Sequence, residues 1–182
     1  MPPMRHFAAV FCLPLAAGCA MATDGAGPGA IGIVDDRREA LLQAGIRPVE
    51  QDRRPALLAA MAADLSRRLP PGLAAPRVSD TAVVVVMDAD TVYLPDGAEL
   101  GGRGWRIVGG LAGTLGEHPA TVVDILGHAG AAPRRLAEAR VQALARGLRR
   151  AGISPTRIAA FDLGTEFGGR ARIEVVLQPL RG

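Results

Sequence analysis

The sequence contains no lysine and no asparagine, and it has few aromatic residues, with one Trp and one Tyr. Without lysine, every basic side chain other than histidine is an arginine, whose planar guanidinium binds carboxylates and phosphates through paired hydrogen bonds. The scarcity of aromatic residues predicts a core of Leu, Val, Ile and Ala. The 21 basic residues are nearly balanced by 18 acidic ones, so the composition does not indicate a nucleic-acid-binding surface.

Long apolar runs are also missing. The run that ends at residue 18 is short and interrupted by Pro14, whereas a membrane-spanning helix needs about 20 apolar residues. It follows Arg5 and ends in small residues before Cys19, an order typical of an export signal. We therefore predict a signal peptide over residues 1–18 and a protein that works outside the cytoplasm.

The end of this run, Leu-Ala-Ala-Gly-Cys at residues 15–19, resembles the lipobox of bacterial lipoproteins. The resemblance implies cleavage before Cys19, attachment of diacylglycerol to its sulfur, and acylation of the new amino terminus, for example with palmitate. Ala16 stands where the lipobox usually has Leu. Ala20 is compatible with sorting to the outer membrane. The alternative is an ordinary secretory signal with an incidental Cys19, which would release a soluble binding protein.

Residues that could support disulfides, metals or catalysis are few. Cys12 and Cys19 are the only cysteines, and both fall in or beside the predicted signal, so no disulfide is available to the mature chain. His118 and His128 are its only histidines and lack metal-ligand spacing, so we predict no metal site and no cofactor. No serine lies in a nucleophile-elbow context. We predict that the protein is not an enzyme.

The first part of the mature chain divides into two segments. Residues 19–34 are small, Gly-rich and nearly uncharged, which predicts a flexible tether. Residues 35–79 predict a helical segment, with helices at residues 35–44 and 54–69. The second helix carries Leu57, Met61 and Leu65 at spacings of three and four residues, and this face of residues 55–69 could dock an envelope protein partner.

From residue 80 the pattern alternates between strands and helices. We predict a strand over residues 82–94, interrupted by a turn or bulge at 88–90, and further strands at 121–126, 158–161 and 172–177. Helices are predicted at residues 103–115 and 133–151. This order predicts an α/β (α+β) domain over residues 80–182, with helices on one face of a small sheet.

This order, together with five motifs, resembles the OmpA-like domain, the periplasmic module with which many Gram-negative envelope proteins hold peptidoglycan. The motifs lie at residues 92–100, 123–128, 136–144, 152–158 and 170–175. The resemblance covers about residues 80–180 and implies a βαβαββ fold. A lipid anchor followed by this domain is the arrangement of peptidoglycan-associated lipoproteins.

The resemblance also implies a binding site. In the family, an Asp after Gly-His-Thr accepts hydrogen bonds from the ammonium group of diaminopimelate in the peptide stem. A helix Arg pairs with the carboxylate of the same diaminopimelate. Arg140 matches the Arg, but Gly130 stands where the Asp is expected, in a shortened loop. The implied peptidoglycan-binding candidates are Arg140, His128, Gly130 and Arg172. A loop His beside Gly127 is more often a local hydrogen-bonding residue than a ligand, which is the alternative for His128. The alternative for Arg172 is that it lies with Arg170 on a solvated strand face.

Arg140 lies on the apolar face of its predicted helix, in line with Leu136 and Leu144. An inward guanidinium needs an anion, because burying an unpaired charge is costly. That anion is either a ligand or an internal acid such as Glu174 or Asp162. Alternatively, the arginine buries only its aliphatic stem and extends its charged end to solvent.

Together these features predict an outer-membrane lipoprotein, anchored at the periplasmic face, whose OmpA-like domain binds peptidoglycan noncovalently and links the membrane to the cell wall. The alternative is a structural or assembly lipoprotein of the envelope that has the OmpA-like fold but has lost the grip on peptidoglycan, because Gly130 replaces the Asp.

Overall fold

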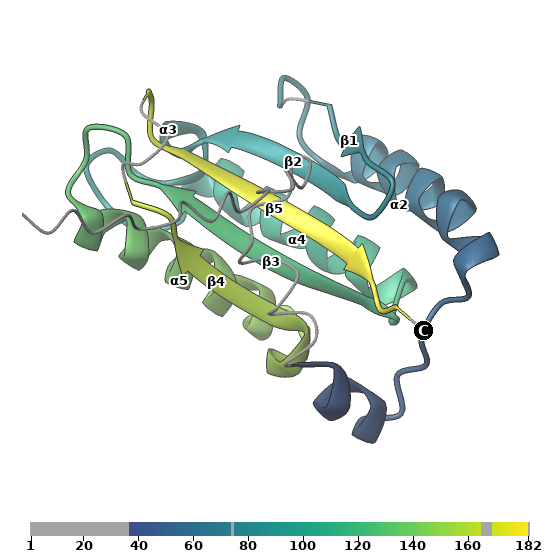
Figure 1. Ribbon diagram of the computed structural model, residues 1–182. Helices are drawn as coiled ribbons and strands as arrows, with labels where there is room; N and C mark the ends of the chain where they lie inside the picture. The colour runs from purple at the N-terminus through teal and green to yellow at the C-terminus, as the bar shows by residue number, and fades with distance from the viewer. Residues whose placement is uncertain (1–36, 74, 165–168, 182) are drawn as a thin grey trace, which may run out of the picture.

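The computed structural model describes residues 37–73, 75–164 and 169–181. The predicted signal peptide, Cys19 and the predicted tether lie outside these residues. The described residues form a five-stranded sheet in the order β1-β2-β5-β3-β4 (Figure 1). Its strands are β1 (Arg77–Val78), β2 (Val83–Asp88), β3 (Thr121–His128), β4 (Ile158–Asp162) and β5 (Arg172–Pro179).

The pairing of the strands follows from the connections between them. β2 and β3 both pair antiparallel with β5, which lies between them. β3 pairs parallel with β4, and these two strands are joined by α5 (Arg134–Arg150), as a parallel pair requires a crossover.

Three longer helices cover one face of the sheet. They are α2 (Arg54–Arg68), α4 (Gly102–Glu117) and α5, with α4 and α5 behind the sheet in Figure 1. Three short elements are η1 (Gln51–Arg53), α3 (Ala89–Val92) and η2 (Pro155–Arg157). The predicted α/β (α+β) class and its βαβαββ order are confirmed, with α2 and the two-residue strand β1 preceding that order.

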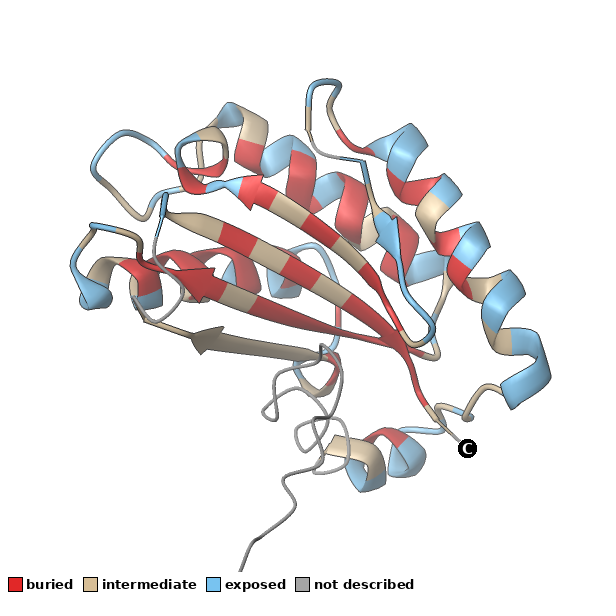
Figure 2. Ribbon diagram, turned by 45° about the horizontal axis from the view of Figure 1, so that its top comes forward, coloured by how far each residue is buried: buried red, intermediate tan, exposed pale blue. Residues whose placement is uncertain are grey.

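The core lies between the sheet and these helices. Buried and half-buried residues alternate along β2 and β5, so one side of each strand faces the helices (Figure 2). Met61 and Leu65 of α2 are fully buried in this core. The prediction that the face of α2 bearing Met61 and Leu65 docks a partner is therefore wrong, because the domain itself covers it. The boundary at residue 80 stays a prediction.

One glycine of α4, Gly110, is explained by close helix packing. A Cβ at Gly110 would lie 3.0 Å from the carbonyl oxygen of Arg68 in α2. Glycine costs a helix about 1 kcal/mol relative to alanine, but here it lets the backbones of α2 and α4 approach each other.

The segment predicted to continue the first strand folds differently. Residues 89–92 form the short helix α3, not a strand after a turn. Thr91 and Val92 are β-branched and favour strands, but this preference is weak and tertiary packing overrides it. Val92 and Tyr93 are buried in the core, and the backbone nitrogen of Ala89 donates to the carbonyl oxygen of Ala171, 3.0 Å away.

The face of the sheet opposite α2, α4 and α5 is partly covered by the start of the described chain. Residues 37–43 are helical, and Leu41 packs against Val122 and Leu180 in a second small apolar cluster. Arg37 forms an ion pair with Asp124 of β3, whose side chain is fully buried. Residues 37–46 therefore lie on the opposite side of the sheet from α5.

Candidate functional site

Arg140 is the central residue of the candidate site. It lies on the inner face of α5 and is 5 % exposed. Its Nε donates to the carbonyl oxygen of Gly97 at 2.9 Å, and its guanidinium carbon lies 5.3 Å from the centre of the Tyr93 ring, within cation–π range. The Tyr93 hydroxyl donates to the carbonyl oxygen of Arg140 at 2.6 Å. Tyr93 thus positions this arginine. No role for Tyr93 was predicted from the sequence.

No carboxylate among the described residues forms an ion pair with Arg140. Both internal acids proposed for it are engaged elsewhere. Glu174 pairs with His128 and Arg172, and Asp162 pairs with Arg134 at 2.8 Å. The alternative in which Glu174 or Asp162 neutralises Arg140 is therefore wrong.

A second buried arginine, Arg157, donates hydrogen bonds to three backbone carbonyl oxygens. Its Nε donates to the carbonyl oxygen of Thr121 at 2.8 Å, and its Nη2 donates to those of Leu115 and His118 at 2.8 and 3.0 Å. Burial lowers the pKa of Arg157. Arg157 joins α4 to β3 and has a structural role, which no sequence motif marked.

The structure separates the other predicted site residues from Arg140. A Cβ at Gly127 would lie 2.5 Å from Val141 of α5, so residue 127 faces the helices and His128 faces the other side. By the same alternation Ile173 is in the core, and Arg172 and Glu174 lie on the face of the sheet opposite α5. His128 and Arg172 are therefore not brought together with Arg140.

His128, Arg172 and Glu174 form a cluster of their own at the end of β3 and β5. His128 Nε2 lies 3.1 Å from Glu174 Oε1, to which Arg172 Nε donates at 2.9 Å. Burial lowers the pKa of His128, although Glu174 opposes the shift. These contacts agree with the alternative in which His128 is a local hydrogen-bonding residue.

Gly130 has no room for a side chain. Its φ of +57° is unfavourable for other residues, and a Cβ there would lie 2.5 Å from the backbone nitrogen of Ala171. An acid at position 130 is therefore incompatible with this packing. Beside Gly130 lies an open cleft of about 560 Å³, between the ends of β2 and β3 and the start of β5.

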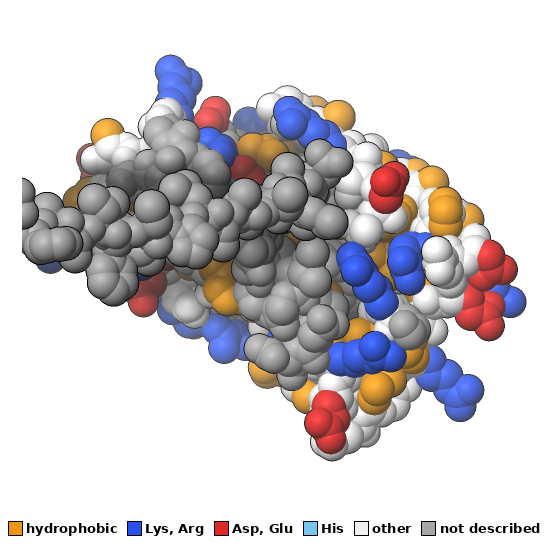
Figure 3. Space-filling model, in the orientation of Figure 1, with side chains coloured by type: hydrophobic (Ala, Val, Ile, Leu, Met, Phe, Trp, Pro, Cys, Tyr) orange, Lys and Arg blue, Asp and Glu red, His pale blue; other side chains and the backbone are white. Residues whose placement is uncertain are grey.

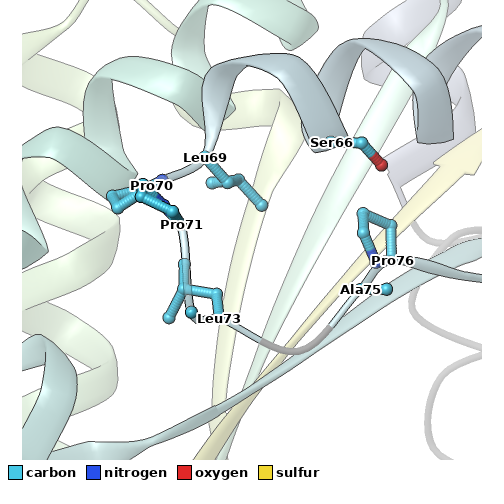
Figure 4. A pocket seen from close by; sticks show the side chains of 8 residues that line it. Ser66, Leu69, Pro70, Pro71, Leu73, Ala75 and Pro76 are labelled. Carbon is cyan, nitrogen blue, oxygen red and sulfur yellow. The ribbon is translucent and has the colours of Figure 1, made fainter.

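A second pocket and the distribution of surface charge give weaker indications of a binding site. The pocket in Figure 4 has a volume of about 210 Å³ and is lined at the end of α2 by apolar residues and Ser66. Ser66 donates to the carbonyl oxygen of Ala62, and no titratable side chain lines this pocket. In Figure 3 the visible arginine and acidic side chains are interspersed over the surface.

The structure also brings together Asp64, Glu117 and His118, whose ligand atoms lie within 4.8 Å of one another. The sequence spacing gave no sign of this cluster. Arg67 pairs with Asp64, and Arg68 pairs with Glu117. Burial opposes ionisation of Asp64, but hydrogen bonds to Glu117 and His118 and the two arginine charges hold its pKa below the usual value. The cluster is explained as an ion-pair network between α2 and α4.

No helix among the described residues is long and apolar enough to cross a membrane. No family model matches the sequence, and no curated protein matches it. The fold, in contrast, is similar to several solved structures.

A MotB-like protein from Desulfovibrio vulgaris superimposes with a TM-score of 0.60 at 16% identity, covering 82% of this chain and 97% of that one. The cell wall anchor of the type VI secretion system from Pseudomonas aeruginosa gives 0.52 at 18% identity, covering 67% and 96%. The periplasmic domain of Helicobacter pylori MotB gives 0.52 at 11% identity, covering 57% and 78%. With its strand order and helices, the chain has an OmpA-like fold.

Proposed function

We propose that this protein is an outer-membrane lipoprotein, anchored through acyl chains on Cys19, whose OmpA-like domain binds peptidoglycan noncovalently. The observation that carries the proposal is Arg140: a buried guanidinium with one hydrogen-bonded carbonyl and no carboxylate partner among the described residues. The similar Pseudomonas protein is described as a cell wall anchor, which supports a cell-wall role at the level of the fold.

The chemistry of Arg140 suits the peptide stems of peptidoglycan. Only its Nε is hydrogen-bonded within the described residues, to Gly97, so the two terminal nitrogens can donate to a carboxylate in the bidentate geometry that arginine favours. Peptide stems carry free carboxylates. The ring of Tyr93 restrains the guanidinium, which reduces the entropy lost on binding.

The test is co-sedimentation of the purified full chain, in detergent, with isolated sacculi. Arg140→Ala should lower the affinity by tenfold or more, because an ion pair formed in a partly buried site is lost. Arg140→Lys should restore only part of it, because lysine keeps the charge without the planar fork. Arg135→Ala is the matched control, since Arg135 is exposed on the same helix.

Circular dichroism and thermal unfolding establish whether each variant is folded. Equal retention of folded Arg140→Ala and wild-type protein would contradict the role of Arg140. Failure of the wild-type protein to bind any sacculi would favour the alternative, an envelope lipoprotein that has the OmpA-like fold but does not bind peptidoglycan. The absence of space for an acid at Gly130 is the observation that favours this alternative.

The lipid anchor is tested separately. We expect mass spectrometry of the mature protein to find an amino-terminal Cys19 with diacylglycerol and a further acyl chain. Two or more chains hold a protein in a bilayer, whereas a single chain is marginal. Cys19→Ser should therefore move the protein from the membrane fraction to the periplasmic fraction. A mature protein with an unmodified Cys19 would overturn the anchor and leave a secreted binding protein.

A further inference from the structure

The cluster of Asp64, Glu117 and His118 brings together atoms of the kind that a divalent metal ion binds. Each residue offers one ligand atom, and the three atoms lie within 4.8 Å of one another. His118 Nε2 and Asp64 Oδ2 are 3.1 Å apart. Tetrahedral ligands at zinc distances of about 2.0–2.2 Å lie about 3.3 Å from each other. The side chain of Glu117 is 54% exposed, so a small movement of it would close the three ligands around an ion.

The other two ligands are held in place by the fold. Asp64 is buried on α2, which approaches α4 closely at Gly110. His118 follows the last residue of α4. Its carbonyl oxygen accepts hydrogen bonds from Nη2 of Arg157 at 3.0 Å and from the backbone nitrogen of Thr121 at 3.1 Å. Ligands that are already ordered lose little conformational entropy when they bind an ion.

A buried hydroxyl beside the cluster is a second, independent observation. Thr114 is fully buried, and its Oγ1 has no hydrogen-bond partner within the part of the chain that the structure describes. Thr114 lies four residues before His118 on α4, and therefore on the same face of the helix. Buried polar groups are nearly always hydrogen-bonded. An unpaired hydroxyl at this place indicates that a further polar group, such as an ion with its bound water, belongs there.

The arginines of the cluster can give way to an ion. Arg67 pairs with Asp64, and Arg68 pairs with Glu117, so two positive charges balance the two carboxylates. The side chains of Arg67 and Arg68 are 69% and 36% exposed, and ion pairs in contact with solvent contribute little to stability. Both arginines can turn to solvent, and a divalent ion then supplies the same two charges at a single point.

We propose that Asp64, Glu117 and His118 form a zinc site that joins α2 to α4. One imidazole nitrogen and two carboxylate oxygens are zinc ligands, and a water molecule completes the tetrahedron. The nitrogen ligand disfavours calcium and magnesium, which take oxygen ligands. The site is independent of peptidoglycan binding, and it fastens the helix that precedes the βαβαββ order to the rest of the domain. No metal site was predicted from the sequence, because Asp64 lies 54 residues before His118 and only the fold brings them together.

The test is thermal unfolding of the full chain in detergent, after removal of metals with a chelator, with and without added zinc. A zinc-chelating dye measures the bound ion in parallel. The wild type should bind one zinc per chain. Zinc at about 100 times the dissociation constant should raise the melting temperature by about 5 °C or more.

Three variants remove one ligand each. His118→Gln and Asp64→Asn should lose both the bound zinc and the shift in melting temperature, and circular dichroism checks that they are folded. Glu117→Gln changes an exposed side chain, so it keeps the test valid if the buried variants do not fold. It should bind zinc at least about tenfold more weakly than the wild type, as expected for the loss of one charged ligand.

Two further variants serve as controls. His128→Gln removes the other histidine among the described residues, which lies on the opposite face of the sheet, and should bind zinc as the wild type does. Arg67→Ala should bind zinc several-fold more tightly, because the ion no longer displaces an arginine from Asp64. A wild type that binds no zinc, or a folded His118→Gln that binds as much zinc as the wild type, would overturn the site and leave the ion-pair network alone.

Discussion

At the scale of single residues, the two buried arginines differ in how their donors are used. Arg157 is bound by three backbone carbonyls, whereas Arg140 is bound by one and stacks on Tyr93. Both are almost inaccessible, so burial alone does not distinguish a structural arginine from one proposed to bind a ligand. The difference lies in the guanidinium nitrogens that have no hydrogen-bond partner among the described residues.

Arg157→Ala should therefore destabilise the protein, because three buried carbonyls would lose their donor. A hydrogen bond to a charged group contributes about 1.5–3 kcal/mol, so we expect a loss of about 3 kcal/mol in the free energy of unfolding. Urea denaturation followed by circular dichroism measures it. Arg135→Ala, on the exposed face of α5, should change the stability by less than about 0.5 kcal/mol. Similar losses for both variants would contradict the structural role.

His128 predicts a dependence of stability on pH. Burial holds its pKa below the usual value of about 6.5 against the effect of Glu174 and Asp162, while Arg172 adds to the lowering. The unfolded chain therefore takes up this proton first as the pH falls, and the free energy of unfolding should decrease below about pH 6.5. The decrease should end once the pH falls below the lowered pKa in the folded state.

Urea unfolding at pH 7.5, 6.0 and 5.0 checks this expectation. The variant His128→Gln keeps a polar side chain that does not titrate, so its stability should fall less than that of the wild type over the same range. Parallel curves for the two proteins would show that His128 is not responsible.

At the scale of elements, the helical residues 37–43 are held to the sheet by a buried ion pair and by the packing of Leu41. Burial raises the pKa of Asp124, and the charge and hydrogen bond of Arg37 oppose the shift. Removing one partner of a buried pair leaves an uncompensated charge and costs about 3–5 kcal/mol. Arg37 is 14% exposed, so we expect Arg37→Ala to lower the free energy of unfolding by about 3 kcal/mol.

The control is Arg47→Ala, which removes an exposed arginine nearby and should have little effect. The double variant Arg37→Ala with Asp124→Asn should recover part of the lost stability, because it removes the buried charge as well. Denaturant unfolding measures all three. Equal stability of Arg37→Ala and Arg47→Ala would show that the ion pair does not hold this segment.

The elements that could be predicted from sequence are the long ones. α2, α4 and α5 each repeat apolar residues over several turns, and β2 is a run of valines. α3 could not be predicted, because the burial of Val92 and Tyr93 outweighs the local preference of its residues. β1 was also missed, since it is two exposed residues whose only strand feature is the pairing with β2.

At the scale of the whole molecule, the inward position of Arg140 was predictable because it follows from helical spacing alone. The rest of the site was not. The side of the sheet on which His128 and Arg172 lie depends on the register of β3 and β5. The cleft is assembled from residues near positions 88–91, 131–132 and 169–171, which only the folded chain brings together.

The ion pair between Arg37 and Asp124 has a mechanical consequence. Asp124 lies within β3, which is paired with strands on both sides. Were the amino terminus anchored as proposed, a pull on it would load this ion pair and the contact of Leu41 before it reached the strand pairing. Residues 37–46 would then detach from the sheet while its five strands stayed joined.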